Sequence, residues 1–304
     1  MVKPDVYDRV AQLDFDSTDR AKERVVKCNL CHSSDFWLAT RRDRYGYAVD
    51  FNICPCCGLG FLSPRLTAEE YGRFYQDIYR PLVSAYHGRL IDAVTVQDEQ
   101  RQYTANLLTF LEPVLSGKKI ETLLDIGGST GVVAEGVVKA FGCRGLVLDP
   151  SPDELEQAQA KGLETVCGLL EDYDETQAGV IDFALLCQTI DHLLDIMSSL
   201  KKIHSILADD GFFYVDIVDF TTIMRREGDV EEAVKIDHPY YLIRSTMEAY
   251  LAKTGFEIVA NTVLPDGHHV GYLCQKAQPV GTINYAGVGE FVNEVRALVD
   301  GVSS

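Results

Sequence analysis

The stretch that decides the fold of this 304-residue chain is IETLLDIGGSTGVVAEGVVKAFGCRGLVLDP, residues 120–150. A short apolar run ends at Asp125, a glycine-rich turn follows, and an apolar helical segment leads to a second apolar run that ends at Asp149. This order predicts a strand–turn–helix–strand unit of a parallel α/β sheet. Glycines suit such a turn because a Cβ would clash with a ligand that passes close to the backbone. The Asp149 carboxylate, 22 residues after Gly127, is placed to accept both hydroxyls of a ribose.

The spacing within the turn is D-x-G-x-x-x-G, with Ser129 where a dinucleotide-binding turn often has glycine. The pattern resembles the first motif of class I S-adenosylmethionine (SAM) methyltransferases, D/E-x-G-x-G-x-G. SAM has no phosphate, and Asp125 supplies a carboxylate that suits its sulfonium and amino-acid end. A glycine turn alone is typical of many α/β proteins. Asp149 at the right distance and the later strands favour a SAM-binding turn over a general α/β turn. The expected SAM-binding residues are Asp125, Gly127, Gly128, Gly131, Asp149, Pro150, Leu170, Glu171 and Gln188.

Two C-x-x-C pairs near the N-terminus predict a structural zinc site. Their cysteines are Cys28, Cys31, Cys54 and Cys57, with 22 residues between the pairs. Each pair forms a tight knuckle that directs two thiolates at one ion, and four thiolates complete a tetrahedron without an open catalytic position. Cys56 is then a spectator, and an iron–sulfur centre is the alternative. The segments 35–40 and 46–53 alternate as expected for the hairpin of a zinc ribbon, with its turn at 43–46.

Residues 65–115 are predicted to form two helices that cover the cofactor as a lid. Thr67 and Glu70 have the spacing of a capping box, which starts a helix through about Tyr79. The second helix is expected over about 88–112. Tyr79 falls at the irregular end of the first helix, where its ring can line a cleft.

Strand and helix signals alternate through the rest of the chain. The uniformly apolar stretch 181–186 suits a strand buried on both faces, and 187–192 then lies over the carboxyl edge, where ligands bind. The other expected strands are 163–167, 212–218, 256–263 and 270–275, the last two as an antiparallel pair. We predict an α/β fold, a seven-stranded, doubly wound Rossmann-like methyltransferase sheet with a small N-terminal zinc ribbon and a helical lid. The expected parts are an N-terminal arm (1–27), the zinc ribbon (28–64), the helical lid and linker (65–116), the SAM-binding methyltransferase domain (117–278) and a C-terminal helix (279–304).

Composition limits the class of partner and the compartment. The chain has 28 Lys and Arg against 46 Asp and Glu, and its net charge of −18 argues against a nucleic-acid substrate. The first 27 residues lack the apolar core of a signal peptide, and no apolar run reaches the about 18 residues of a membrane span. Nine cysteines then favour reduced thiols and a metal site over disulfides, so we expect a cytoplasmic protein. The sequence does not predict its oligomeric state.

A second resemblance concerns the acceptor. The order of zinc ribbon, aromatic helix, glycine turn, strand-end histidine and DHPYY (237–241) resembles the zinc-containing sugar C-methyltransferases and their shorter relatives in bacterial polysaccharide gene clusters, over roughly residues 28–275. The resemblance implies catalytic or substrate-contacting roles for His192, Asp237, His238 and Tyr79.

The sequence departs from this family in two ways, and its histidines also allow roles outside catalysis. The sequence ends before the second C-terminal α/β domain of the longer family members, and Asp237 stands where glutamate is usual. His238, next to Pro239, also suits a hydrogen-bonded structural histidine. His268 and His269 are expected to be a solvated pair in the turn before the last strand.

Together these features predict SAM-dependent methyl transfer to a small molecule, most consistent with a nucleotide-linked or polysaccharide-bound sugar. Carbon or oxygen methylation requires removal of a proton, and histidine serves either reaction because its pKa lies near neutrality. One alternative is an RNA base methyltransferase, for which Arg41, Arg42 and Arg44 offer the only basic cluster on the ribbon. The other is a non-catalytic SAM-binding scaffold.

Overall fold

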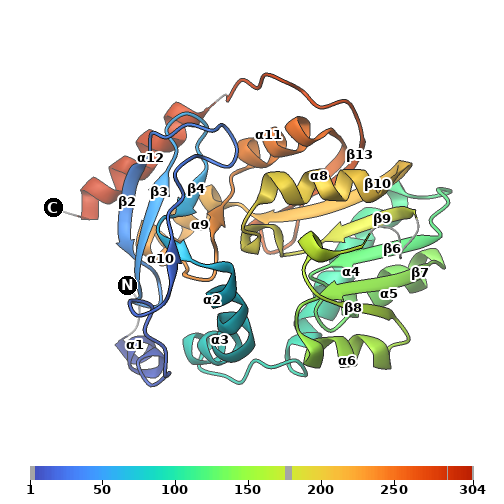
Figure 1. Ribbon diagram of the computed structural model, residues 1–304, viewed down its shortest axis with the longest axis horizontal. Coiled ribbons are helices and arrows are strands. Elements are labelled where there is room, and N and C mark those ends of the chain that lie inside the picture. Colours follow the sequence, from blue (N-terminus) through green and yellow to red (C-terminus); the bar gives the residue numbers. More distant parts are fainter. Residues whose placement is uncertain (1–3, 175–179, 286, 303–304) are drawn as a thin grey trace.

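The computed structural model describes residues 4–174, 180–285 and 287–302. A four-stranded sheet near the N-terminus and a seven-stranded sheet lie at opposite ends of the molecule, and the helices α2 (Ala68–Arg73) and α3 (Tyr79–His87) lie between them (Figure 1). A third, two-stranded sheet pairs β1 (Lys22–Glu23) with β5 (Arg65–Leu66). Among the helices of the described ranges, none has both the length and the apolar character that a membrane span requires.

The seven-stranded sheet has the order β12-β13-β10-β9-β6-β7-β8. Its strands are β6 (Thr122–Ile126), β7 (Arg144–Asp149), β8 (Glu164–Cys167), β9 (Ile181–Leu186), β10 (Leu207–Val218), β12 (Phe256–Val263) and β13 (His269–Lys276). β13 runs antiparallel to both of its neighbours, and the other pairs are parallel. The predicted α/β sheet is therefore confirmed, including its antiparallel last pair. The strand order reverses between β6 and β9, which is where open α/β sheets bind ligands.

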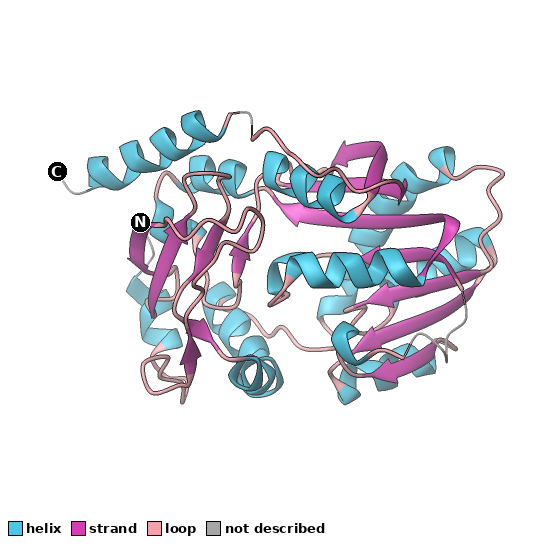
Figure 2. Ribbon diagram, turned by 45° about the horizontal axis from the view of Figure 1, so that its top comes forward, coloured by secondary structure: helices cyan, strands magenta, loops and turns pink. Residues whose placement is uncertain are grey.

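Helices cover both faces of this sheet, as Figure 2 shows. One face packs against α4 (Val96–Val114), α5 (Val132–Phe141) and α6 (Pro152–Ala160). The other packs against α8 (Ile196–Ile206) and α11 (Arg244–Thr254). Successive residues of β6 alternate between them, since Leu123 belongs to the first core and Leu124 to the second. The apolar run that the sequence shows is thus buried on both sides.

The N-terminal sheet has the order β11-β4-β3-β2. The predicted hairpin is present as β2 (Trp37–Arg42) and β3 (Ala48–Ile53), and β4 (Gly60–Leu62) pairs with β3. The fourth strand, β11 (Tyr240–Tyr241), comes from a distant part of the chain that the sequence did not connect with the ribbon. The elements packed around this sheet include α1 (Pro4–Val10), α9 (Phe220–Glu227), α10 (Val230–Ala233) and α12 (Val288–Val302).

The lid helices differ from the prediction in their bounds. The first helical region does not end at Tyr79, because α2 continues through a π-helical turn (Phe74–Ile78) into α3. The second predicted helix does not begin at Gly88. That glycine ends α3 with a φ of +65°, a left-handed conformation typical of a helix C-terminus, and α4 begins only at Val96. β10 also begins earlier than the predicted strand 212–218, because it includes residues 207–211 and changes register there.

Candidate active site

The glycine turn connects β6 to α5 at the carboxyl edge of the sheet. Gly127 has a φ of +69°, and a Cβ there would lie 2.6 Å from Cγ2 of Thr189. A Cβ on Gly128 would lie 2.7 Å from Cγ of Asp125. Real Cβ atoms do not approach so closely, so larger residues would displace the turn. Thr189 immediately precedes the short helix η3 (Ile190–His192), so the glycine turn and the histidine-bearing turn touch.

Asp125 is a buried carboxylate without a strong partner. Its side chain is 1% exposed, and neither oxygen has a hydrogen bond of good geometry. Burial raises the pKa of Asp125 to about 7; the charge of Asp149 adds to the rise, and the backbone N–H of Ala134 opposes it weakly. A buried carboxylate in this state favours a cationic ligand, because such a ligand supplies the missing compensation.

Asp149 lies at the tip of β7 and holds the turn. One carboxylate oxygen accepts a hydrogen bond from the Ser129 N–H and the other from the Ser151 N–H, both at 2.9 Å. Burial raises the pKa of Asp149 to about 6, and the two N–H groups oppose the rise. A carboxylate has about four acceptor positions, so Asp149 can accept two further hydrogen bonds from a ribose.

The remaining predicted cofactor residues lie along the same edge. Pro150 follows Asp149 directly, and Leu170 and Glu171 lie in η2 (Leu170–Asp172) after β8. Leu170 packs in the core at 3% exposure, and Glu171 accepts a 3.4 Å hydrogen bond from Ser199 of α8. If Leu170 and Glu171 contact an adenine, the adenine must therefore bind at the edge of the hydrophobic core.

Gln188, which follows β9, is held by a buried network. Its φ is +51°, and its N–H donates to Asp216 at 2.6 Å. Tyr103 donates its hydroxyl to the other oxygen of Asp216 at 2.8 Å. The Gln188 side chain lies 3.1 Å from Nε2 of His269, which differs from the expectation of a solvated histidine. His269 is instead 13% exposed and pairs with Asp266 at 2.7 Å, which raises its pKa although burial opposes the rise.

His192 follows β9 and contacts the helical segment of residues 68–87. Its Nδ1 lies 2.6 Å from the Tyr75 hydroxyl and 3.0 Å from the Asp237 carbonyl oxygen. Tyr75 donates its own proton to that carbonyl at 2.7 Å. Because the tyrosine proton is committed, we assign the His192 proton to Nδ1, which leaves the lone pair on Nε2. Tyr79 completes this aromatic group, with its ring centroid 6.4 Å from that of His192.

His238 lies between two carboxylates. Its Nδ1 is 2.8 Å from Oδ2 of Asp191, and its Nε2 is 3.4 Å from Oδ2 of Asp237. The rings of His238 and His192 meet edge to face with centroids 4.6 Å apart. Burial would raise the pKa of Asp191, but the neighbouring His238 and His192 hold it well below its usual range. Burial lowers the pKa of His238, so we assign a neutral ring with Nδ1–H donated to an ionised Asp191.

The structure therefore brings together all four residues predicted for the acceptor end: His192, His238, Asp237 and Tyr79. Asp191 and Tyr75 are the two members of this group that the sequence did not indicate. Asp191 directly precedes His192, so an acidic–histidine pair was visible in the sequence, but its partner lies 47 residues away. Asp191, His192 and His238 each place one ligand atom within 4.8 Å of the others, close enough to bind one metal ion.

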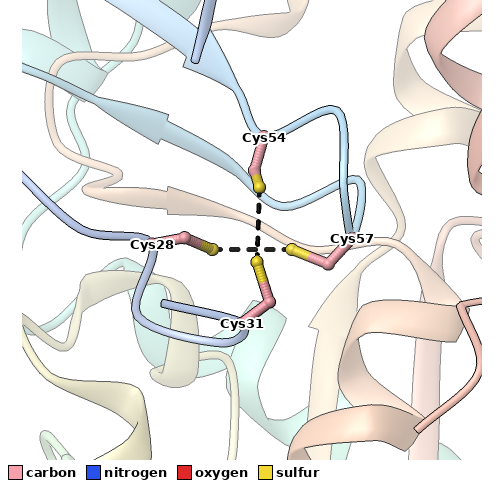
Figure 3. A group of neighbouring side chains, drawn as sticks. All are labelled: Cys28, Cys31, Cys54 and Cys57. Atoms are coloured by element: carbon pink, nitrogen blue, oxygen red, sulfur yellow. Dashed lines mark hydrogen bonds between the residues drawn. The ribbon is translucent and has the colours of Figure 1, made fainter. Parts of the chain in front are cut away.

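The four predicted cysteine ligands converge on one point between β3, β4 and the N-terminal knuckle (Figure 3). The sulfurs of Cys28 and Cys57 are 3.5 Å apart, as are those of Cys31 and Cys54. Zn–S bonds of about 2.3 Å in a tetrahedron place sulfurs roughly 3.8 Å apart, so the cluster fits a zinc ion. Cys56 is exposed and stands outside it.

Comparison with known proteins gives a family and a fold. A family described as a methyltransferase domain matches residues 96–261. None of the curated proteins compared with the chain matches it.

The similar solved structures include a chain from a Haloferax volcanii complex that contains the Trm112 methyltransferase activator, with 13% identity, 69% of this chain and 98% of that chain covered, and a TM-score of 0.50. A Nostoc punctiforme protein assigned as an O-methyltransferase has 19% identity and a TM-score of 0.49, and this chain spans 60% of its length, with 60% of this chain covered. A SAM-dependent methyltransferase from Clostridium acetobutylicum has 15% identity, 68% and 99% coverage, and a TM-score of 0.48. At 13% identity, the likeness to the Haloferax volcanii chain supports the fold alone.

Proposed function

The chain belongs to the methyltransferase-domain family, and on that premise we propose that it transfers the methyl group of SAM to a nucleotide-linked or polysaccharide-bound sugar, with a histidine as general base. The observation that supports this acceptor site is the group of the buried Asp191 and His238 with the half-buried His192, which lies beside the glycine turn at the carboxyl edge of the sheet. Ligands of open α/β sheets bind at this edge.

The proposed active-site residues have two roles, cofactor binding and proton removal. SAM, when bound, supplies an activated methyl group on a sulfonium. Asp149 would accept the ribose hydroxyls, and Asp125 would balance the positive charge. The glycine turn lets the cofactor approach the backbone. The protein must then align the acceptor with this methyl group and remove one proton from the acceptor atom.

His238 is the stronger candidate for the base. Asp191 holds its Nδ1–H, so the lone pair on Nε2 points away from Asp191 and toward Asp237. When Nε2 takes the acceptor proton, the positive ring lies between two carboxylates, which stabilise it. His192, with its lone pair on Nε2, would contact the acceptor from the edge of the same group. The ring of Tyr75 and the ring and hydroxyl of Tyr79 offer a stacking surface and a hydrogen bond that suit a sugar.

The four-cysteine cluster supports the further proposal of one structural zinc per chain. A closed set of thiolates would stabilise the knuckles and would leave no open position for catalysis. We also propose that the chain divides into the five predicted parts, of which residues 1–3, 175–179, 286 and 303–304 lie outside the described ranges.

The three arginines of the RNA alternative each have an intramolecular partner, which favours the sugar acceptor over RNA. Arg41 pairs with Asp50 at 3.1 Å, and the guanidinium groups of Arg42 and Arg44 lie over the rings of Tyr7 and Tyr86 at 4.8 and 5.2 Å. These side chains are therefore directed at intramolecular partners. The scaffold alternative predicts SAM binding with no turnover of any acceptor.

The test is transfer of a labelled methyl group from SAM to a panel of nucleotide-linked sugars. We expect turnover of at least one sugar and a loss of about 100-fold or more for His238→Gln, since a general base contributes about 10²–10⁴. His204→Gln on α8, remote from the edge, is the matched control. Unchanged turnover in His238→Gln would reject the base, whereas turnover that requires an added divalent cation would assign the histidine group to a metal site.

A further inference from the structure

The segment that carries Asp237 and His238 is held by the cysteine-bearing sheet on both sides. Before the pair, the Arg44 N–H at the tip of the β2–β3 hairpin donates to the Val234 carbonyl at 3.0 Å. After it, β11 pairs with β4, so that Tyr240 and Tyr241 lie opposite Phe61 and Gly60. The segment is therefore an additional strand and loop of the ribbon sheet.

Asp43 contacts the residue that directly precedes the catalytic pair. Its side chain is 1% exposed at the tip of the hairpin. One carboxylate oxygen accepts from the N–H groups of Tyr45 and Tyr47 at 3.0 and 2.8 Å, which closes the hairpin turn. The other oxygen accepts from the N–H of Ile236 at 2.8 Å. Ile236 directly precedes Asp237, so one side chain connects the hairpin turn with the catalytic segment.

The histidine group is thus assembled from two bodies. Asp191 and His192 follow β9 of the seven-stranded sheet, whereas Asp237 and His238 belong to the segment that the ribbon holds. The Asp191–His238 hydrogen bond spans the two at 2.8 Å. A relative shift of about 1 Å would lengthen this bond beyond hydrogen-bonding distance.

We propose that Asp43 is a positioning residue of the acceptor site, which keeps His238 in register with Asp191 and His192 and makes the ribbon a functional part of that site. This inference rests on the proposed role of His238. Asp43 is not among the residues proposed to contact the cofactor or the acceptor, so its effect passes through the backbone of Ile236.

Asp43→Asn is the sharpest variant, because it removes one contact. The amide oxygen can still accept from Tyr45 and Tyr47, but the amide nitrogen then faces the Ile236 N–H, and two donors cannot bond. Asp50→Asn is the matched control: it lies in the same hairpin, where its Oδ1 accepts from Arg41 at 3.1 Å. Arg44→Met is a second test, since it removes the 2.8 Å bond from the Arg44 side chain to the Glu232 carbonyl and keeps a stem of similar length.

The readout is NMR of protein labelled at the histidine ring carbon Cε1, recorded across pH. The His238 signal is identified by its loss in His238→Gln. We expect Asp43→Asn to shift the chemical shift and titration midpoint of His238, with the His204 signal and the SAM dissociation constant unchanged. Arg44→Met should produce a smaller shift in the same signal, and Asp50→Asn none. Once an acceptor has been identified, kcat should fall about 10- to 100-fold in Asp43→Asn, as expected when His238 is misplaced by about 1 Å.

The outcomes separate this inference from the proposed function. An unchanged His238 signal in folded Asp43→Asn overturns the positioning role, and the proposed base stands if His238→Gln is inactive. A shifted signal together with full activity of His238→Gln supports the contact and rejects the base. If Asp43→Asn does not fold, the Arg44→Met signal decides: no change in it overturns the inference.

Discussion

Asp125→Asn should stabilise the SAM-free protein while it weakens SAM binding. The ionised carboxylate of Asp125 is buried without a strong hydrogen bond, and the Asp149 carboxylate lies near it. An asparagine keeps the size of the side chain and removes the charge. Its own buried polar atoms still lack partners, so only the cost of the charge is relieved.

The magnitude follows from the pKa. Burial raises the pKa of Asp125 from its ordinary 3.8 to about 7. At 1.36 kcal/mol per unit, this corresponds to an upper bound of about 4 kcal/mol of folding free energy at pH 8. Structural relaxation reduces such costs, so we expect about 1–4 kcal/mol. In a chain of this size, that corresponds to a rise in Tm of several degrees, at about 2 °C per kcal/mol.

The sign of the pH dependence is fixed by the direction of the shift. Between about pH 4 and pH 7 the folded state holds a proton on Asp125 that the unfolded state has lost. The free energy of unfolding of the wild type therefore falls as pH rises through this window. The advantage of Asp125→Asn should be small near pH 4, grow up to about pH 7 and remain constant above it. Asp149, whose pKa is raised to about 6, adds the same trend to both proteins.

The assay pairs thermal unfolding with titration calorimetry between pH 5 and pH 8. Wild-type SAM affinity should fall below about pH 7, because the cationic ligand must displace the proton of Asp125. Asp125→Asn should bind SAM roughly 10- to 100-fold more weakly at pH 8, the loss expected for a charged hydrogen bond, with a flatter pH profile. If Asp125→Asn has the same Tm as the wild type at pH 8, the carboxylate is compensated in solution and the reasoning fails.

The other predictions concern the ribose, the metal and the buried network. Asp149→Asn should weaken SAM binding by roughly 1–3 kcal/mol through lost charge-assisted hydrogen bonds, and equal affinity in calorimetry would place the cofactor elsewhere. Denatured protein should release one zinc per chain to a chromogenic chelator. Cys54→Ser should lower both the zinc content and the Tm. Freshly purified protein without metal would rule out the zinc site. Tyr103→Phe should lower the free energy of unfolding by about 1–3 kcal/mol, because Asp216 loses its 2.8 Å hydroxyl donor. Urea denaturation measures this change, and an unaltered midpoint would show that the hydrogen bond contributes nothing.

The sheet was predictable because its signals are local. The central strands β6, β7 and β9 contain short apolar runs, and the glycine turn lies directly between β6 and α5, so neighbouring residues carry the information. The cysteine cluster was predictable for the same reason, since each knuckle is four residues long. The bounds of the lid helices were wrong because Gly88, which sits inside an otherwise helical pattern, ends α3.

The acceptor end depends on contacts that no local pattern contains. The resemblance to a known family suggested His192 and His238 separately, but the Asp191–His238 bond joins residues 47 positions apart. The bond from Ile236 to Asp43 spans 193 positions. Asp43 looked like an ordinary turn residue because hairpin turns often contain aspartate. Its second role becomes visible only when β11 joins the ribbon sheet.

The decisive measurement is a structure with S-adenosylhomocysteine bound. We expect the ribose hydroxyls to contact the Asp149 carboxylate, the amino-acid end to lie near Asp125, and the sulfur to face the group of His192 and His238. A nucleoside bound away from the glycine turn, or a sulfur directed away from both histidines, would contradict it.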